Sequence, residues 1–279
     1  MTKIIADTLS GIPVEEAKSL GLTYIPQIIN FKGKSYRDDS EMNTKMFLDM
    51  LIKSEELPTT AAPPPDLYSK YYQEFSKNNE TIIVICPSTE LSGTFRSATV
   101  AAKDFSNSDI RIINTMQLGG GLASTIKSSI KLLNEGKSAN EIEKFINEFI
   151  HKENNYFVVD TLEYLHKGGR IGGAQALFGG ILQIKPILCI KQGKVEPVES
   201  QRTSKRAISR LKEIVLTDCP RNQSANLSIM HGDAEKKANE IAEYFSNTLG
   251  INDIPIYELP PAFLVHSGPG VIGASFFQN

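Results

Sequence analysis

Short apolar runs alternate with amphipathic segments along the first half of the chain. Residues 4–6 and 22–29 are apolar runs followed by turn-forming residues, a pattern typical of short buried strands. Between them, Pro13 precedes two glutamates, as at a helix N-terminus. Residues 81–87 are continuously apolar and β-branched, and residues 109–115 form the next such run after a predicted helix. Continuous apolar strands alternating with helices predict a parallel sheet covered on both faces.

Two further helices are predicted before the middle of the chain, over residues 119–134 and 138–152. In the second, Ser138 precedes Glu141 by three positions, which is the spacing of a capping box. This part of the chain therefore continues the α/β pattern.

The pattern changes in the second half. Residues 156–162 predict a strand, residues 166–180 are rich in glycine, and residues 181–200 predict two strands joined by a hairpin at Gln192-Gly193. The remaining predicted elements are helices over 203–216 and 234–249 and strands over 226–230 and 254–259. Antiparallel pairing in this part indicates a second domain.

The predicted fold class is therefore α/β with two domains. A parallel sheet flanked by helices is expected in residues 1–154, and a mixed or antiparallel α/β domain in residues 155–279. The 279 residues are enough for two packed cores. Hydrophobic residues make up 41% and charged residues 22%, which excludes a disordered or fibrous chain.

Charge and cysteine content indicate which partners and which cellular compartment to expect. Thirty Lys and Arg against 32 Asp and Glu give no basic excess, so binding to nucleic acid is not expected. The three cysteines (Cys86, Cys189 and Cys219) form no CxxC pair, which indicates a reducing compartment. The N-terminus has no signal-peptide core, and no run approaches the roughly 18 apolar residues of a membrane span. The sequence predicts a soluble cytoplasmic protein.

The common catalytic signatures are absent. The Gly-Lys-Ser at Gly136 lacks the glycine five residues earlier that a phosphate-binding loop needs. The glycines at 119–121 lack the GxGxxG spacing, and we interpret them as a helix start packed tightly against a sheet. The four histidines have no zinc-ligand spacing, and GxSxG is missing. No catalytic residue, metal or cofactor is therefore predicted.

Two hydroxyl-rich turns are candidates for ligand binding. Ser92, Gly93 and Thr94 follow a buried strand and precede a helix, at the edge where α/β proteins bind anions. The ordinary alternative is that Ser92 or Thr94 only caps the helix. Residues 58–63 form an extended, proline-bounded loop that presents two threonine hydroxyls on opposite sides of the chain, although a plain linker would look the same.

One histidine and two arginines are further candidates. His266 is predicted at a strand end beside the glycine turn of Gly268 and Gly270, where backbone approaches a ligand closely; the ordinary alternative is a histidine that is only hydrogen-bonded in place. Arg170 lies among glycines, and its guanidinium can donate paired hydrogen bonds to an oxyanion. Arg202 begins a basic helix start, which indicates either an acidic partner or a solvated charge run.

Seven motifs together resemble the DegV family in order and spacing over nearly the whole chain. They are Asp7-Thr8, Tyr36-Arg37-Asp38, Pro58-x-Thr60, Leu91-Ser92-Gly93-Thr94, Lys167-Gly168-Gly169-Arg170-Ile171, Lys185-Pro186-Ile187 and His266-x-Gly268-Pro269-Gly270. The resemblance implies two α/β domains with a long-chain fatty acid between them. It also implies similarity to the fatty-acid-binding subunit of bacterial fatty acid kinase, which presents the acyl carboxylate to a separate ATP-dependent kinase and carries acyl phosphate away for phospholipid synthesis.

The resemblance also implies which residues hold the lipid. The family's lipid-binding positions fall on Thr60, Ser92, Gly93, Thr94, His266, Gly268 and Gly270. It places the carboxylate on the hydroxyls of Thr60 and Ser92, with His266 completing the network. Arg170 matches a position near the headgroup, and Arg202 matches one on the kinase-facing surface.

The chain departs from the family pattern at two places. Family members commonly read Pro-x-Thr-Ser-Gln-Pro where residues 58–63 read Pro-Thr-Thr-Ala-Ala-Pro, so a hydroxyl and an amide are lost and either Thr59 or Thr60 can contact the headgroup. The first loop, residues 7–10, reads Asp-Thr-Leu-Ser in place of the usual Asp-Ser-Thr.

Two other functions remain open on the sequence alone: a small-molecule phosphotransferase, and an interaction protein that uses residues 202–206 and has an empty or closed interdomain core. The resemblance favours a lipid carrier that is not itself an enzyme. Its expected partners are a fatty acid, a kinase subunit and, transiently, a membrane surface, with the chain itself a monomer. Four phenylalanines are candidates to line the lipid tail, although an ordinary core position explains each equally well: Phe95, Phe178, Phe276 and Phe277.

Overall fold

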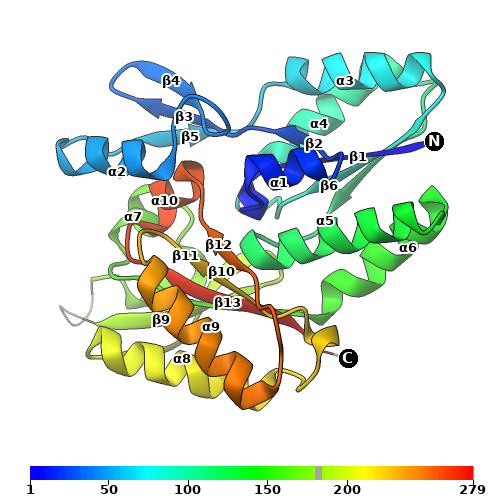
Figure 1. The fold of residues 1–279 in the computed structure, drawn as a ribbon. Helices are drawn as coiled ribbons and strands as arrows, with labels where there is room; N and C mark the ends of the chain where they lie inside the picture. Colours follow the sequence, from blue (N-terminus) through cyan, green and yellow to red (C-terminus); the bar gives the residue numbers. More distant parts are fainter. Residues whose placement is uncertain (180–183, 279) are drawn as a thin grey trace.

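A computed structural model describes residues 1–179 and 184–278. Figure 1 shows two main sheets at different levels of the molecule, with helices above, between and below them. Within the described residues, a four-stranded sheet belongs to the N-terminal half and a six-stranded sheet to the C-terminal half, while a three-stranded sheet lies to one side. The predicted α/β fold class is confirmed.

The N-terminal sheet is parallel throughout and has the order β2-β1-β6-β7. Its strands are β1 (Thr2–Asp7), β2 (Thr23–Ile25), β6 (Thr81–Cys86) and β7 (Ile110–Asn114). One face packs against α3 (Pro65–Lys77) and α4 (Thr94–Ala102), and the other against α5 (Gly119–Asn134) and α6 (Ala139–Phe149). A short helix, α1 (Val14–Ser19), connects β1 to β2.

The prediction of one strand over residues 22–29 is wrong, because Pro26 divides it between two sheets. Proline has no N–H to donate to a strand partner and has a fixed φ. The chain therefore leaves the parallel sheet after β2 and forms a separate antiparallel sheet. This sheet has the order β4-β3-β5, with β3 (Ile28–Phe31), β4 (Lys34–Arg37) and β5 (Thr59–Ala61); α2 (Thr44–Ile52) lies between β4 and β5 in the sequence.

The glycines at the start of α5 allow it to pack directly on the second sheet. A Cβ on residues 119–121 would collide with Met230, Ser228 and Glu153 in turn, and all three lie on strands of that sheet. The interpretation of this triplet as a tightly packed helix start is confirmed. Because α5 also covers the N-terminal sheet, it joins the two sheets into one structure.

The C-terminal sheet is mixed and has the order β10-β9-β8-β13-β11-β12. Its strands are β8 (Glu153–Val158), β9 (Lys185–Lys191), β10 (Lys194–Gln201), β11 (Ser228–His231), β12 (Ile256–Glu258) and β13 (Ile272–Phe277). Two helices, α8 (Ser204–Asp218) and α9 (Glu235–Leu249), cover its outer face. Since β8 begins at Glu153, the sheet starts close to the predicted boundary at residue 154, which stays a prediction.

Two predicted elements in the second half of the chain differ in how they compare with the structure. The hairpin at Gln192-Gly193 is confirmed, and both residues have the positive φ of a tight hairpin turn. The predicted strand before His266 is wrong: this segment is α10 (Pro261–Ser267), which begins with a proline at the position that helices favour. Residues 180–183, part of the glycine-rich segment and of the first predicted hairpin strand, lie outside the described residues.

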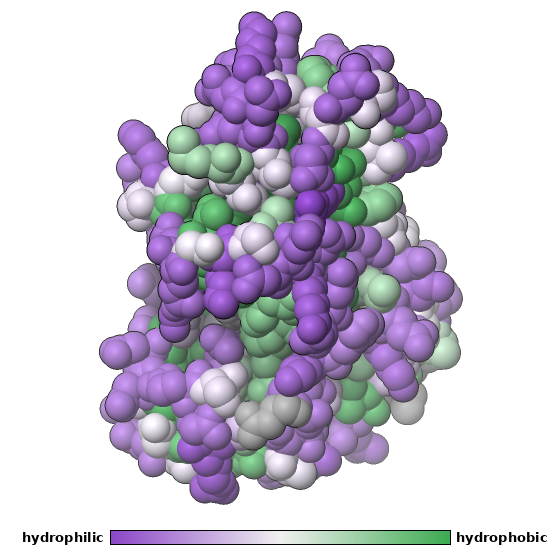
Figure 2. All heavy atoms as spheres, turned by 90° about the vertical axis from the view of Figure 1, so that its right-hand side faces the viewer, coloured by the Kyte–Doolittle hydropathy of each residue, from purple (hydrophilic) through white to green (hydrophobic). Residues whose placement is uncertain are grey.

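The face of the molecule that Figure 2 shows is largely polar. Figure 2 shows hydrophilic side chains over most of one face, with apolar side chains gathered in smaller patches between them. Across residues 1–179 and 184–278, none of the helices combines the length and the apolar character needed to cross a membrane.

Candidate functional site

A cavity lies between the two halves of the molecule. The empty space between its lining residues is about 860 Å³, a figure that includes open solvent at its mouth. Most of its wall is apolar and comes from both halves: Leu9, Ala62, Leu91, Leu118, Phe157, Leu165, Ile190, Val195, Met230, Leu259, Ala262, Phe263 and Val271. Such a wall suits an alkyl chain, because burial of each methylene is favourable.

Polar side chains gather on one part of this wall. Thr60 lies on β5, Ser92 on the loop before α4, Arg170 after α7 (Glu163–Lys167), and His266 on α10. Three of these four, Thr60, Arg170 and His266, also border a second hollow of about 770 Å³. Thr60, Arg170 and His266 therefore stand where the apolar cavity meets this second hollow, and Ser92 lies on the cavity wall alone.

Thr60 and His266 are hydrogen-bonded across the two halves, with Oγ1 and Nε2 2.9 Å apart. The other ring nitrogen, Nδ1 of His266, is buried and has no partner among the described residues. A buried N–H without an acceptor is costly, so the imidazole proton belongs on Nε2, which donates to Thr60. The Thr60 hydroxyl then keeps its own proton for a ligand. Thr59 is exposed and does not reach the apolar cavity.

His266 stays neutral at physiological pH. Burial, together with the smaller effect of the positive charge of Arg170, lowers its pKa to about 4. Gly168 packs directly against the ring, since a Cβ at this position would collide with Nδ1. Because Gly168 has no side chain, it makes room for the imidazole.

Arg170 is a half-buried cation at the cavity wall. Its Nη1 donates to the carbonyl of Gly168 at 2.7 Å and its Nε to the carbonyl of Leu91 at 3.2 Å. No acidic side chain in the described parts of the chain pairs with it. Because carbonyls leave the positive charge uncompensated, the guanidinium can receive an anionic ligand.

Behind Ser92 a hydrogen-bonded network leads into the N-terminal sheet. Ser92 Oγ lies 3.0 Å from Thr94 Oγ1, which donates to Asp7 Oδ2 at 2.7 Å. Gln27 Nε2 donates to Asp7 Oδ2 at 2.7 Å and to Thr94 Oγ1 at 3.0 Å. Thr94 is therefore buried one step behind the cavity wall, whereas Ser92, Gly93 and Gln27 lie on it.

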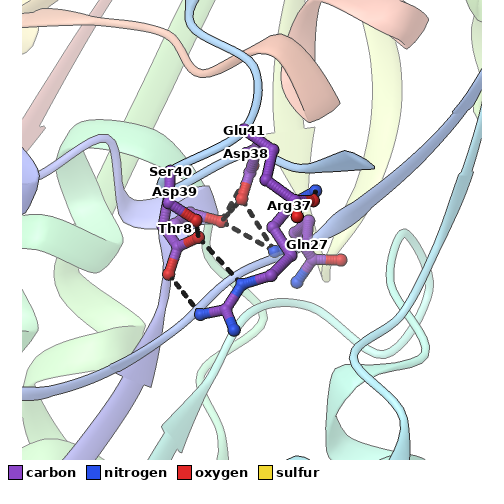
Figure 3. A network of polar contacts seen from close by, with 7 residues as sticks. All are labelled: Thr8, Gln27, Arg37, Asp38, Asp39, Ser40 and Glu41. Atoms are coloured by element: carbon purple, nitrogen blue, oxygen red, sulfur yellow. Dashed lines mark hydrogen bonds and ion pairs between the residues drawn. The ribbon is translucent and has the colours of Figure 1, made fainter. Parts of the chain in front are cut away.

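A second buried acid, Asp38, lies next to this network. It accepts from the hydroxyl of Thr8 at 2.8 Å and from the backbone N–H of Gln27 at 2.8 Å. The neighbouring Arg37 is directed to Asp39 instead, as Figure 3 shows. Without a cation, burial raises the pKa of Asp38 to about 7.

The remaining predicted residues lie outside the cavity wall. Gly268 ends α10 with φ +71° and packs against the ring of Tyr164, and Gly270, with φ +80°, lies beside Asp160. Arg202 is exposed just before α8. None of the four phenylalanines proposed for the tail lines the cavity; Phe157 and Phe263 do so instead.

Sequence reasoning missed several wall residues because long-range packing brings them there. Gln27 follows the proline that divides the first predicted strand, which is the one local signal for it. Met230 is reached only through the pairing of β11 in the second sheet. In the part of the chain that is described, no group of three or more His, Cys, Asp or Glu side chains could hold a metal ion.

Comparison with known proteins agrees with this architecture. The model of the DegV family, described as uncharacterised proteins, matches residues 1–279. The chain belongs to the DegV family. A DegV domain-containing protein of Clostridium perfringens is 31% identical over 281 residues, which cover 99% of both chains.

Two solved DegV structures share the fold over the whole chain. A DegV family protein from Thermus thermophilus, described by its fatty acid binding, has a TM-score of 0.92 at 26% identity and is matched over 100% of this chain and 99% of its own. DegV of Bacillus subtilis, described as a fatty acid binding protein, has a TM-score of 0.85 at 28% identity, with 99% of each chain covered. The structural neighbours of this DegV protein are thus fatty-acid-binding proteins.

Proposed function

We propose that this chain binds a long-chain fatty acid in the cavity, with the tail among the apolar side chains and the carboxylate at Thr60, Ser92 and His266. The observation that carries the proposal is the chemical division of the cavity, which is apolar along most of its wall and polar where it meets the second hollow. An amphiphile with one anionic end matches this division. The fatty acids of the solved relatives support it.

The energetics fit a tail that gives affinity and a polar end that gives orientation. Burial of about 14 methylenes at roughly 0.8 kcal/mol each contributes on the order of 11 kcal/mol. Association costs roughly 4–15 kcal/mol, so burial of the tail alone is marginal. A carboxylate without donors would oppose binding, because a buried ion needs partners. The hydroxyls of Thr60 and Ser92 and the charge of Arg170 supply them.

The protein's role in this proposal is that of a carrier. It presents the carboxylate to a separate ATP-dependent kinase and then carries the acyl phosphate for phospholipid synthesis, without catalytic residues of its own. Arg170, between the two hollows, stands near the headgroup, and the exposed Arg202 belongs to the kinase-facing surface. An interaction protein without a ligand would have an empty or closed core between its halves, so the lipid content of the purified protein separates the two functions.

The test is chemical identification of what the purified protein holds. Extraction under denaturing conditions and mass spectrometry should release about one fatty acid per chain, and its length and unsaturation give the acyl preference. A preparation free of lipid that also fails to bind added fatty acid would overturn the proposal.

The kinase step has a separate test in Arg202→Ala. Because Arg202 lies away from the cavity, we expect this variant to bind fatty acid as the wild type does and to form less acyl phosphate with the kinase and ATP. Equal acyl phosphate formation by both proteins would remove Arg202 from the kinase-facing surface.

A further inference from the structure

Asp7, Thr94 and Ser92 form a hydrogen-bonded chain that runs from a buried carboxyl group to the cavity wall. Asp7 Oδ2 and Thr94 Oγ1 are 2.7 Å apart, and Thr94 Oγ1 and Ser92 Oγ are 3.0 Å apart. Asp7 is fully buried and lies outside the cavity wall. Each hydroxyl has one proton to donate, so the charge of the group at the inner end limits the directions that the hydrogen bonds can take.

When Asp7 is ionised, the hydroxyl protons of this hydrogen-bonded chain point inward, toward Asp7. A carboxylate only accepts, so Thr94 must donate its single proton to Asp7. Thr94 Oγ1 then accepts from Gln27 Nε2 at 3.0 Å, and toward Ser92 it can only accept as well. Ser92 then keeps its hydrogen bond to Thr94 only by donating its proton to it, away from the cavity.

When Asp7 is protonated, the protons of this hydrogen-bonded chain can point outward, toward the cavity. The Asp7 hydroxyl donates to Thr94, Thr94 donates to Ser92, and the Ser92 proton becomes free to enter the cavity. A bound carboxylate needs donors, so it favours this direction. It also favours a neutral Asp7, because two carboxylates in one poorly hydrated site repel each other.

The surroundings of Asp7 permit the change of charge at physiological pH. The titratable groups that face it are Tyr24 from β2, Tyr68 from α3, Cys86 from β6 and the nearby Asp38; none is a cation. Burial raises the pKa of Asp7 to about 7, and the hydrogen bonds from Thr94, Gln27 and the Leu9 N–H oppose this rise.

We propose that Asp7 is a positioning residue that takes up a proton when a fatty carboxylate binds, so that Ser92 donates to the ligand. This inference rests on the proposed function and adds a proton to its binding step. The acid acts only through Thr94 and Ser92 and does not touch the ligand.

The proposal gives binding a definite dependence on pH. Since ligand binding raises the pKa of Asp7, one proton is taken up per ligand above the pKa of the free protein. Affinity is constant below about pH 7 and falls above it, by up to about tenfold per pH unit, until the pKa of the complex is passed.

Calorimetric titration with micromolar dodecanoate tests this directly. Monomeric dodecanoate is already ionised at about pH 8, since a free carboxyl group titrates near pH 4 to 5, so proton exchange reports on the protein. Titrations in buffers of different ionisation enthalpy should show uptake of close to one proton per ligand. The variant Asp7→Asn, whose amide imitates the neutral acid, should bind dodecanoate with no proton uptake and with affinity independent of pH.

Matched variants separate the alternatives. Asp38→Asn changes a buried acid of similar pKa that does not contact Thr94, so its uptake should remain. If Asp7→Asn does not fold, Thr94→Val breaks the same chain and should also abolish uptake. Uptake that persists in Asp7→Asn and disappears in His266→Gln would assign the proton to His266 and overturn the proposal.

The result with the wild type distinguishes the two proposals. Tight binding without proton exchange would overturn the role of Asp7 and leave fatty acid binding intact. Failure to bind dodecanoate or longer fatty acids at any pH would overturn the proposed function itself.

Discussion

The hydrogen bond between Thr60 and His266 allows a test of the site within one short strand. Thr60→Val keeps the shape of the side chain and removes its hydroxyl. His266 then loses the partner of Nε2, and its Nδ1 has none already, so the imidazole is left unsatisfied in a buried position. We expect the free energy of unfolding of the empty protein to fall by about 1–3 kcal/mol, the cost of such a group.

Thr60→Val should also lower the affinity for the fatty acid, because it removes a hydrogen bond to the carboxylate. A hydrogen bond to a charged group contributes about 1.5–3 kcal/mol, which corresponds to an affinity lower by about 10- to 150-fold. Thr59→Val is the matched control: the same substitution one residue earlier, on an exposed side chain outside the apolar cavity. Its stability should change by less than about 0.5 kcal/mol, with affinity unchanged.

Fatty acid titration of delipidated protein and urea unfolding measure the two effects separately. Equal loss of affinity in Thr59→Val and Thr60→Val would refute the assignment of the headgroup to the Thr60 side of the strand. Unchanged binding by Thr60→Val would refute the role of its hydroxyl.

Three further predictions concern Ser92, the start of α5 and a buried acid. Ser92→Ala should weaken fatty acid binding by about tenfold or more in the same titration, and an unchanged affinity would contradict its role as donor. Gly121→Ala places a methyl group against the Glu153 carboxylate and should lower the free energy of unfolding in urea by about 1–3 kcal/mol; wild-type stability would show that the helix can shift at no cost. Burial raises the pKa of Glu153 to about 8, so its stabilising contribution is full at low pH and is lost as the pH rises to about 8. Glu153→Gln should therefore gain stability relative to the wild type between about pH 5 and 8, by up to about 1.4 kcal/mol per pH unit, and a constant difference would contradict this.

Much of the fold could be predicted because local chemistry and tertiary structure agree. The capping box of Ser138 and Glu141 is present with both of its hydrogen bonds, and the helix over residues 119–134 has the bounds predicted for it. The two wrong strand predictions both lie at prolines. Pro26 divides one apparent strand between two sheets, and Pro261 starts a helix where an apolar, β-branched segment had predicted a strand.

The site could be predicted only in part for a similar reason. Thr60 and Ser92, which both line the cavity, could be proposed as candidates because hydroxyls in turns have a local signature. The contact of Thr60 with His266 joins residues 206 positions apart, and that of Thr94 with Asp7 joins residues 87 positions apart. Such contacts depend on how the sheets pack, which no local pattern specifies. The placement of Thr60, rather than Thr59, on the cavity wall likewise depends on the register of β5.

A structure of the protein with its fatty acid bound tests the central claim most directly. The account predicts that the carboxylate oxygens lie within hydrogen-bonding distance, about 2.5–3.2 Å, of Thr60 Oγ1 and Ser92 Oγ, with the tail extending past Phe157 and Met230. A carboxylate placed away from these hydroxyls, or a tail that leaves the apolar cavity empty, would contradict it.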